Sequence, residues 1–214
     1  MKPFKRARLI FLLILSFTLL LTVSTAAQNK VVVIPLMEEA TGPSAPVPQT
    51  GQTTSHRTGD DGDLQMGVSL PTPRFQIPSG LHLRGQGVVI DHLTELIWQY
   101  DPVDSVPQPL ELSWNGAIDY CNTLDLGDYT DWRLPNLREL QSLINYKYFF
   151  PAISNAAGTG KGVGNDPFYA LQSSSYWSAT THADFSNAAW CIEFFEGHTD
   201  TSNKTDSKYV RCVR

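Results

Sequence analysis

The positions of the tryptophans indicate that the folded part of this chain begins near residue 75. All five tryptophans lie between Trp98 and Trp190, whereas residues 40–73 alternate proline and glycine with threonine, serine and aspartate. A stretch without aliphatic periodicity buries too little apolar surface to offset the entropy of ordering the chain. We therefore expect a flexible arm over residues 28–74 that includes a short β-prone run at 29–36, and one folded domain over residues 75–214.

The first 27 residues have the composition of a secretory signal peptide. Four basic residues precede an uncharged, mostly apolar run over residues 9–23, and small residues follow at 24–27. This run is shorter than the roughly 20 residues that span a membrane, so cleavage is favoured over an uncleaved anchor, the alternative that stays open. We expect an exported chain, in the periplasm, on the outer surface or secreted, with no membrane segment after cleavage.

Net charge excludes some classes of ligand, and cysteine content limits the number of disulfides. Cleavage after residue 27 leaves 12 basic and 21 acidic residues, a net charge of −9. This balance excludes a general nucleic-acid binder and disfavours a densely anionic ligand. In an exported chain, the three cysteines permit one disulfide and leave one thiol over.

The order of predicted elements indicates an α+β fold. Short strands are expected at 88–90, 96–98, 176–180, 189–194 and 208–214. Ser113 is the expected cap of a helix whose apolar stripe runs to Leu124 and stops near Gly127, and a second helix begins at Asn136. Residues 151–175 carry four glycines without periodicity, which predicts a long irregular loop of the kind that often binds ligands.

Several motifs of this region occur in a characteristic order. They are Trp98, Ser113-Trp114 with Tyr120-Cys121, Asp131-Trp132-Arg133-Leu134-Pro135-Asn136, Tyr176-Trp177-Ser178-Ala179-Thr180 and Val210-Arg211-Cys212-Val213-Arg214. From about residue 88 to 214 the sequence resembles the Lcl C-terminal domain family, named after the C-terminal domain of the Legionella collagen-like adhesin. The resemblance implies a C-type-lectin-like fold, with two helices packed on a small, mostly antiparallel sheet.

The resemblance also bears on the cysteines. Cys121 and Cys212 both lie on apolar faces, and the family pattern implies a disulfide between them; two reduced, buried thiols are the alternative. Cys191 is interpreted as a spare structural thiol, because no base lies near it in the sequence.

The motif at residues 132–139 is expected to have a structural role. Arg133 precedes a helix start and is flanked by apolar residues, so we expect it to pair with a carboxylate such as Glu139. Capping-box spacing links Asn136 to Glu139, and Pro135 blocks extension of the helix toward Trp132.

Candidate ligand-binding residues border the long loop and a later turn. They are Tyr146, Tyr148, Asp166, His182 and Asp184. Aromatic rings can stack on sugars, and polar side chains around a loop can fix a ligand. No cofactor or metal is expected. Calcium is chemically possible at the aspartates of residues 59–63 or in the loop, but neither segment has the spacing of a known calcium site.

These observations favour a non-catalytic recognition or adhesion module that binds an extracellular glycan or protein through the 146–175 loop face, with no catalytic residues. Two alternatives stay open. One is an enzyme related to the formylglycine-generating, sulfatase-modifying factors, which need a second reactive cysteine that this sequence does not offer. The other is a structural subunit of an envelope assembly, a homo-oligomer joined through residues 31–36.

Overall fold

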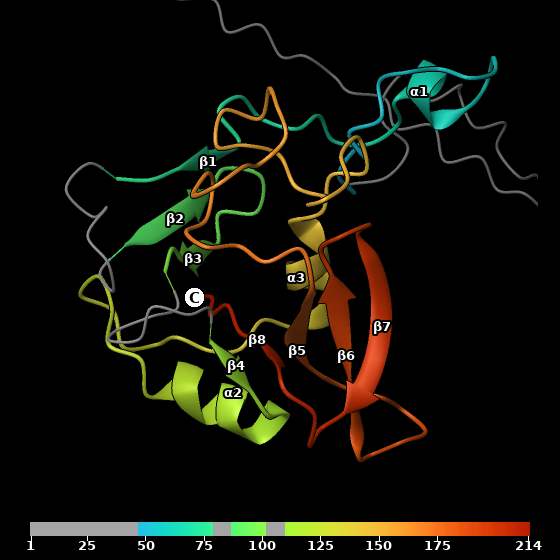
Figure 1. Ribbon diagram of the computed structural model, residues 1–214. Coiled ribbons are helices and arrows are strands. Elements are labelled where there is room, and N and C mark those ends of the chain that lie inside the picture. The colour runs from blue at the N-terminus through green and yellow to red at the C-terminus, as the bar shows by residue number, and fades with distance from the viewer. Residues whose placement is uncertain (1–46, 79–86, 102–109) are drawn as a thin grey trace, which may run out of the picture. The chain divides into compact units, whose positions relative to one another are not determined.

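The computed structural model describes residues 47–78, 87–101 and 110–214 (Figure 1). The predicted signal peptide and the β-prone run at 29–36 lie outside these residues. Within the described ranges, no helix is both long enough and apolar enough to cross a membrane.

Two sheets and three short helices make up the described structure, which is α+β as the element order predicts. The first sheet has the antiparallel order β1-β2-β3, and the second has the order β4-β8-β5-β6-β7 with only β5 and β8 parallel. The strands are β1 (Phe75–Gln76), β2 (Val88–Asp91), β3 (Ile97–Gln99), β4 (Glu111–Leu112), β5 (Ser175–Thr181), β6 (Ala188–Glu193), β7 (His198–Asn203) and β8 (Lys208–Tyr209). The helices are α1 (Asp61–Leu64), α2 (Trp114–Asn122) and α3 (Leu137–Ser142).

Helix α2 begins where the sequence predicts and ends earlier. The Ser113 side chain accepts a hydrogen bond from the Gly116 N–H, as an N-cap should. The helix stops at Asn122, although the buried apolar residues continue to Leu124 and beyond. They remain buried because the chain folds back under Trp132, whose indole N–H donates to the Leu126 carbonyl at 3.1 Å.

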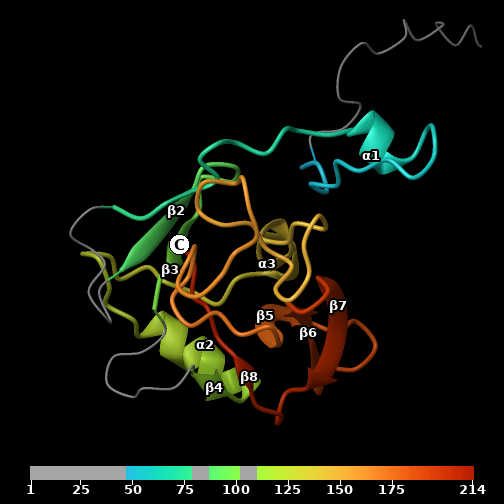
Figure 2. The same cartoon turned by 45° about the horizontal axis from the view of Figure 1, so that its top comes forward.

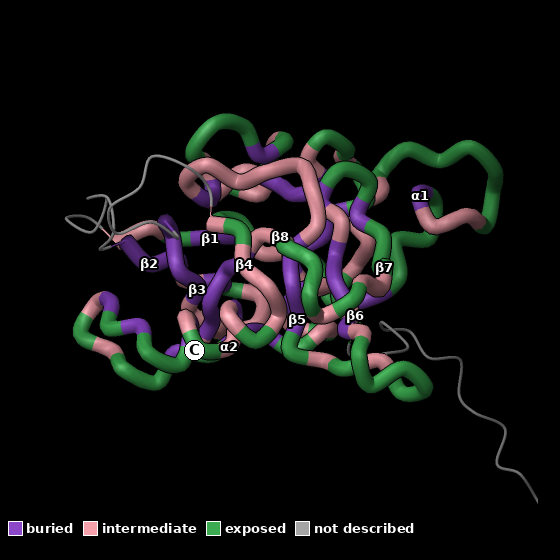
Figure 3. The backbone as a smooth tube through the Cα atoms, turned by 60° about the horizontal axis from the view of Figure 1, so that its bottom comes forward, coloured by how far each residue is buried: buried purple, intermediate pink, exposed green. Residues whose placement is uncertain are grey.

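Helix α3 lies against β5 and β6 (Figures 1 and 2). Its N-terminus carries the predicted capping box, in which Asn136 accepts backbone N–H bonds and Glu139 accepts the N–H of Asn136. Both faces of β5 and β6 are covered, which is why these strands are largely buried whereas β7 is largely exposed (Figure 3). Tyr176 and Ile192 belong to one core cluster, and Trp177 and Cys191 to the other.

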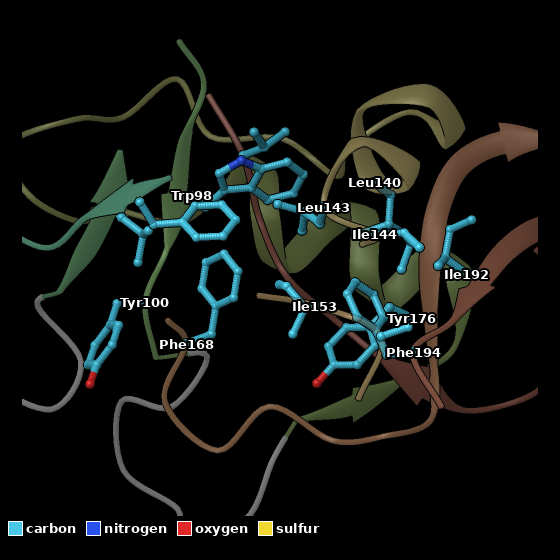
Figure 4. Packing of buried hydrophobic residues seen from close by; sticks show 14 residues of the cluster. Trp98, Tyr100, Leu140, Leu143, Ile144, Ile153, Phe168, Tyr176, Ile192 and Phe194 are labelled. Atoms are coloured by element: carbon cyan, nitrogen blue, oxygen red, sulfur yellow. The ribbon is translucent and has the colours of Figure 1, made fainter. Parts of the chain in front are cut away.

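The long loop supplies part of the core rather than standing clear of it. It contains no helix or strand between α3 and β5, in agreement with its glycine-rich sequence. Ile153 and Phe168 from this loop are nevertheless fully buried, and they lie between Trp98 of the first sheet and Tyr176 of the second (Figure 4). The exposed residues Phe149 and Phe150 lie just before this buried segment and remain accessible.

The C-terminal segment ties these parts together. The disulfide Cys121–Cys212, which the resemblance implies, is confirmed and joins α2 to this segment with a Cα–Cα distance of 5.5 Å. One residue further on, Val213 forms bridges with both Trp98 and Arg133. The Gln99 N–H also donates to the Cys212 carbonyl at 3.0 Å.

A buried ion pair that the sequence analysis did not anticipate anchors the start of the first sheet. Arg74 and Asp91 are 2% and 0% exposed, and two hydrogen bonds of 2.8 and 2.9 Å join the guanidinium to the carboxylate. The same guanidinium donates to the Ser142 carbonyl at the end of α3, while the carboxylate accepts from Leu93 and Thr94. Hydrogen bonds to both charges compensate for the hydration that they lose on burial. The pair also links the first sheet to α3.

Reduction of the Cys121–Cys212 disulfide should destabilise the domain strongly. The bridge spans 91 residues, so the chain-entropy relation predicts a loss of about 4 to 5 kcal/mol in the free energy of unfolding. Guanidinium titrations with and without reductant measure this loss, and a Cys191→Ala variant excludes a contribution of the third thiol. Equal midpoints in the two titrations would contradict the prediction.

Removal of the buried carboxylate should also be costly. Asp91→Asn leaves the Arg74 guanidinium buried beside a neutral group, and we expect a loss of about 3 to 5 kcal/mol. Asp131→Asn is the matched control, because Asp131 pairs with Arg214 in similar geometry but is 66% exposed. The control should leave the denaturation midpoint unchanged. Similar losses in both variants would show that burial is not what makes the Arg74–Asp91 pair important.

Candidate functional site

The predicted scaffold residues form a rigid turn before α3. Trp132 is 2% exposed, and its indole N–H donates to the Leu126 and Tyr129 carbonyls. Pro135 is buried, and its carbonyl accepts the Ala179 N–H of β5 at 2.7 Å. The turn is thus fixed to β5 and does not present these groups to a ligand.

Arg133 and Glu139 form a two-bond ion pair at the surface, with both N–O distances 2.7 Å. Partial burial raises the pKa of Glu139, but hydrogen bonds from Arg133 and from the Asn136 N–H outweigh that effect and leave the pKa below its usual value. The carboxylate therefore stays ionised at neutral pH and holds the helix cap. This arrangement occupies the guanidinium as predicted and leaves it little capacity for a ligand.

Four exposed aromatic side chains lie in two segments, residues 146–150 and residue 195, which contact each other through Phe150 and Phe195; we call these side chains the aromatic patch. They are Tyr146, Phe149, Phe150 and Phe195, with exposed fractions of 48%, 68%, 56% and 39%. The ring centroids of Phe150 and Phe195 are 5.1 Å apart, and the Phe150 N–H donates to the Phe195 carbonyl at 2.7 Å. The patch thus combines the segment before the long loop with the turn that follows β6.

The backbone beneath the patch is held from two directions. Asn145 is 4% exposed, and its N–H donates to the Ala152 carbonyl while its side chain accepts the Lys147 N–H. The Tyr146 N–H donates to the Thr50 carbonyl, so the segment before the domain contacts it here. The exposed rings therefore project from an ordered backbone, which lowers the entropic cost of binding through them.

Two of the predicted ligand residues, Tyr148 and Asp166, make contacts within the domain itself. Tyr148 is half-buried, with the Lys147 ammonium 5.8 Å from its ring centroid. Asp166 accepts the Ala156 N–H at 2.6 Å and so fixes the loop. Lys161 donates to the Phe150 carbonyl and places a cation at the edge of the patch.

His182 and Asp184 lie apart in the fold from this loop, in the turn between β5 and β6. The His182 ring stacks on Trp190, with centroids 5.2 Å apart, and contacts the Phe185 ring at 5.0 Å. Asp184 is exposed, and its N–H donates to the Nδ1 of His182. A second aromatic group therefore forms around this turn.

Two tryptophans lie at the edge of the core. Trp114 of α2 and Trp190 of β6 belong to apolar faces of their elements, but both are half-buried. Trp190 is covered by the His182 ring, whereas Trp114 donates its indole N–H to the Ser178 carbonyl and is capped by the Lys204 ammonium at 3.9 Å. Periodicity identifies the side of a helix or strand that packs on the core. It does not show which residues on that side lie at the edge of the core and stay partly exposed.

The acidic run 59–63 forms α1 and its cap. Asp60 accepts the backbone N–H groups of His56, Arg57 and Asp63, and these hydrogen bonds lower its pKa. Over the described parts of the chain, no three His, Cys, Asp or Glu side chains are grouped closely enough to hold a metal ion.

Sequence reasoning missed Phe195 as a surface residue. The available signal is the pair Phe194-Phe195 after a strand, since alternation places only one of two adjacent side chains in the core. Phe194 is 1% exposed, whereas Phe195 points outward and joins the aromatic patch.

Comparison with known proteins assigns the family. No curated protein matches the chain. The family model of the Lcl C-terminal domain matches residues 87–214, which is more than half of the chain and includes both cysteines of the disulfide and the four residues of the aromatic patch. The chain therefore belongs to the Lcl C-terminal domain family.

Proposed function

We propose that this chain is an exported, non-catalytic recognition module that binds a glycan or protein partner outside the cytoplasm through the aromatic patch on the 146–175 loop face. The observation that carries the proposal is the exposure of four aromatic rings on an ordered backbone. Grouped apolar rings in contact with water are unfavourable in an isolated domain, and they are characteristic of interaction sites.

The composition of the patch favours a protein partner over a glycan. Phe149 and Phe150 offer large apolar faces without a hydrogen-bonding group, whereas sugars need several polar contacts in addition to a ring. Aromatic side chains at the centre of a contact and charged ones at its rim are typical of protein interfaces. Lys147 and Lys161 supply such a rim.

The proposal includes a C-type-lectin-like fold. Two features support it: the disulfide from the first domain helix to the last segment, and a long irregular loop that precedes the strands β5, β6 and β7. Domains of this fold carry many unrelated functions, so the fold alone does not select a ligand.

Export is supported by the disulfide and by the predicted signal peptide. A bridge between Cys121 and Cys212 forms and persists in an oxidising compartment. The residues of the predicted signal peptide lie outside the described part of the chain.

The state of the cysteines supports a non-catalytic role. Cys121 and Cys212 are consumed by the disulfide, which leaves Cys191 as the free thiol. Cys191 is 1% exposed, and burial raises its pKa to about 11. A thiol of this kind is protonated at neutral pH and is a poor nucleophile, unlike the reactive cysteines of the sulfatase-modifying enzymes.

Cys191 should resist alkylation in the folded protein. Because the thiolate is the reactive form and the pKa lies near 11, we expect negligible iodoacetamide labelling of the native, oxidised chain at pH 7.5 within an hour. Labelling should reach one equivalent once guanidinium unfolds the domain. Intact mass spectrometry provides the count, and rapid labelling of the native protein would revive the enzymatic alternative.

Loss of the patch rings should abolish partner binding without unfolding the domain. We expect beads coated with residues 28–214 to adhere to cell surfaces, and Phe149→Ser combined with Tyr146→Ser to reduce the retained beads at least tenfold. Leu64→Ser is the matched control and should retain adhesion, because Leu64 is 56% exposed but lies in α1, outside the 146–175 loop face.

Treatment of the cells separates the two classes of partner. Protease treatment should remove bead adhesion if the partner is a protein, whereas glycosidase treatment should remove it if the partner is a glycan. Adhesion that is equal for the wild type, the patch variant and uncoated beads would reject the proposal.

A further inference from the structure

An open pocket lies beside the turn between β5 and β6, away from the residues of the aromatic patch. Its volume is about 440 Å³, within the range of roughly 300–1,000 Å³ that is usual for small-molecule sites. Its lining consists of Phe185, Asn187, Ala188, Thr201, Ser202, Asn203 and Asp206. The residues thus come from the turn, the start of β6, the end of β7 and the turn that follows.

Strand register explains why polar side chains converge here. Ala188 pairs with Asn203, and Trp190 pairs with Thr201, so these four residues share one face of the sheet. Ala188 is small and leaves space beside Asn203, while the Trp190 ring forms the floor of the adjoining aromatic group. A pocket at the end of the two strands follows from this pattern.

Hydrogen bonds hold the polar groups in place. The Asn187 amide donates to the side-chain oxygen of Asn203 at 3.3 Å, and the Ser202 hydroxyl donates to Asp206 at 2.6 Å. The turn itself is closed by the Lys204 N–H, which donates to the Asn187 carbonyl at 2.8 Å. Each amide and the carboxylate retain further hydrogen-bonding capacity, since an Asn side chain has two N–H donors and a carbonyl acceptor.

The aromatic wall of the pocket is the exposed Phe185 ring, which is held by contact with His182. Phe185 is 61% exposed, and its ring contacts His182, which in turn stacks on Trp190. Contact with the His182 ring restricts the Phe185 ring, so less conformational entropy is lost when a ligand covers it. An exposed ring beside amide and carboxylate groups matches the two surfaces of a pyranose, one of C–H groups and one of hydroxyls.

Charge selects among saccharides. Asp206 lines the pocket and Asp184 lies on the adjoining turn, whereas the nearby cation of Lys204 is occupied by the Trp114 ring and the Thr181 hydroxyl. A carboxylate accepts hydrogen bonds from sugar hydroxyls and repels sulfate or carboxylate groups. The pocket therefore suits a neutral ligand.

We propose that this pocket binds a neutral pyranose, either free or at the end of a glycan, with Phe185 stacked on the sugar ring and with Asn187, Asn203 and Asp206 bonded to its hydroxyls. This site is distinct from the aromatic patch and provides a second contact by which the module recognises a glycosylated surface.

Saturation-transfer NMR on the oxidised chain of residues 28–214 tests the proposal. The probes are glucose, galactose, mannose and N-acetylglucosamine, with glucose 6-sulfate as the anionic comparison. We expect signal transfer to at least one neutral sugar and a weaker transfer to the sulfated one. Phe185→Ala should lower the affinity for the neutral sugar at least tenfold, and Asp206→Asn should lower it severalfold.

Two controls keep the result interpretable. Thermal unfolding of each variant should match the wild type, because Phe185 and Asp206 are exposed. Leu64→Ser, in α1 and outside both proposed contact sites, should leave sugar binding unchanged. Failure of the patch appears as lost bead adhesion and failure of this site as lost signal transfer, so the two are distinguishable. No transfer to any neutral sugar, binding that persists in Phe185→Ala, or preference for glucose 6-sulfate would overturn the proposal.

Discussion

The C-terminal segment, residues 208–214, is the connection on which the rest of the domain depends. Its first residues extend the second sheet through β8, Cys212 is bonded to α2, and Val213 bridges both the first sheet and the turn before α3. Short strands and short helices bury little surface individually. One segment that joins both sheets, α2 and the turn before α3 makes their burial cooperative.

The connections made by residues 208–214 explain how an irregular loop can carry the proposed recognition surface. The middle of the loop is anchored by Ile153 and Phe168, which fill the space between the two sheets, and Asp166 fastens its return. The exposed rings at the loop's beginning therefore rest on packed core rather than on a mobile excursion. The turn between β5 and β6 is similarly supported, because His182 lies on Trp190. Both proposed contact sites are surface extensions of buried elements.

Local signals in the sequence were sufficient for several features. The capping box at Asn136 and the Arg133–Glu139 pair follow from spacings of a few residues. The pair of Cys121 with Cys212 required the family resemblance, because the residues alone left reduced thiols open. The Arg74–Asp91 pair was not predictable, because the two residues belong to different segments. Only the folded sheet shows that the two side chains are buried together as an ion pair. Strand β7 was missed because its six residues, His198–Asn203, lack the apolar alternation that marks a strand; backbone pairing with β6 forms it instead.

Hydrogen exchange, resolved by residue, tests the cooperative frame most directly. The amides of Gln99, Val213 and Ile192 lie in the first sheet, the C-terminal segment and the second sheet. If the frame is one unit, these amides exchange at one common, slowest rate in the oxidised protein, and reduction accelerates all of them together. The amides of residues 147 and 149, in the aromatic patch's segment, should exchange faster and independently of the disulfide. Separate rates for the two sheets in the oxidised protein, or acceleration confined to α2 upon reduction, would contradict this account.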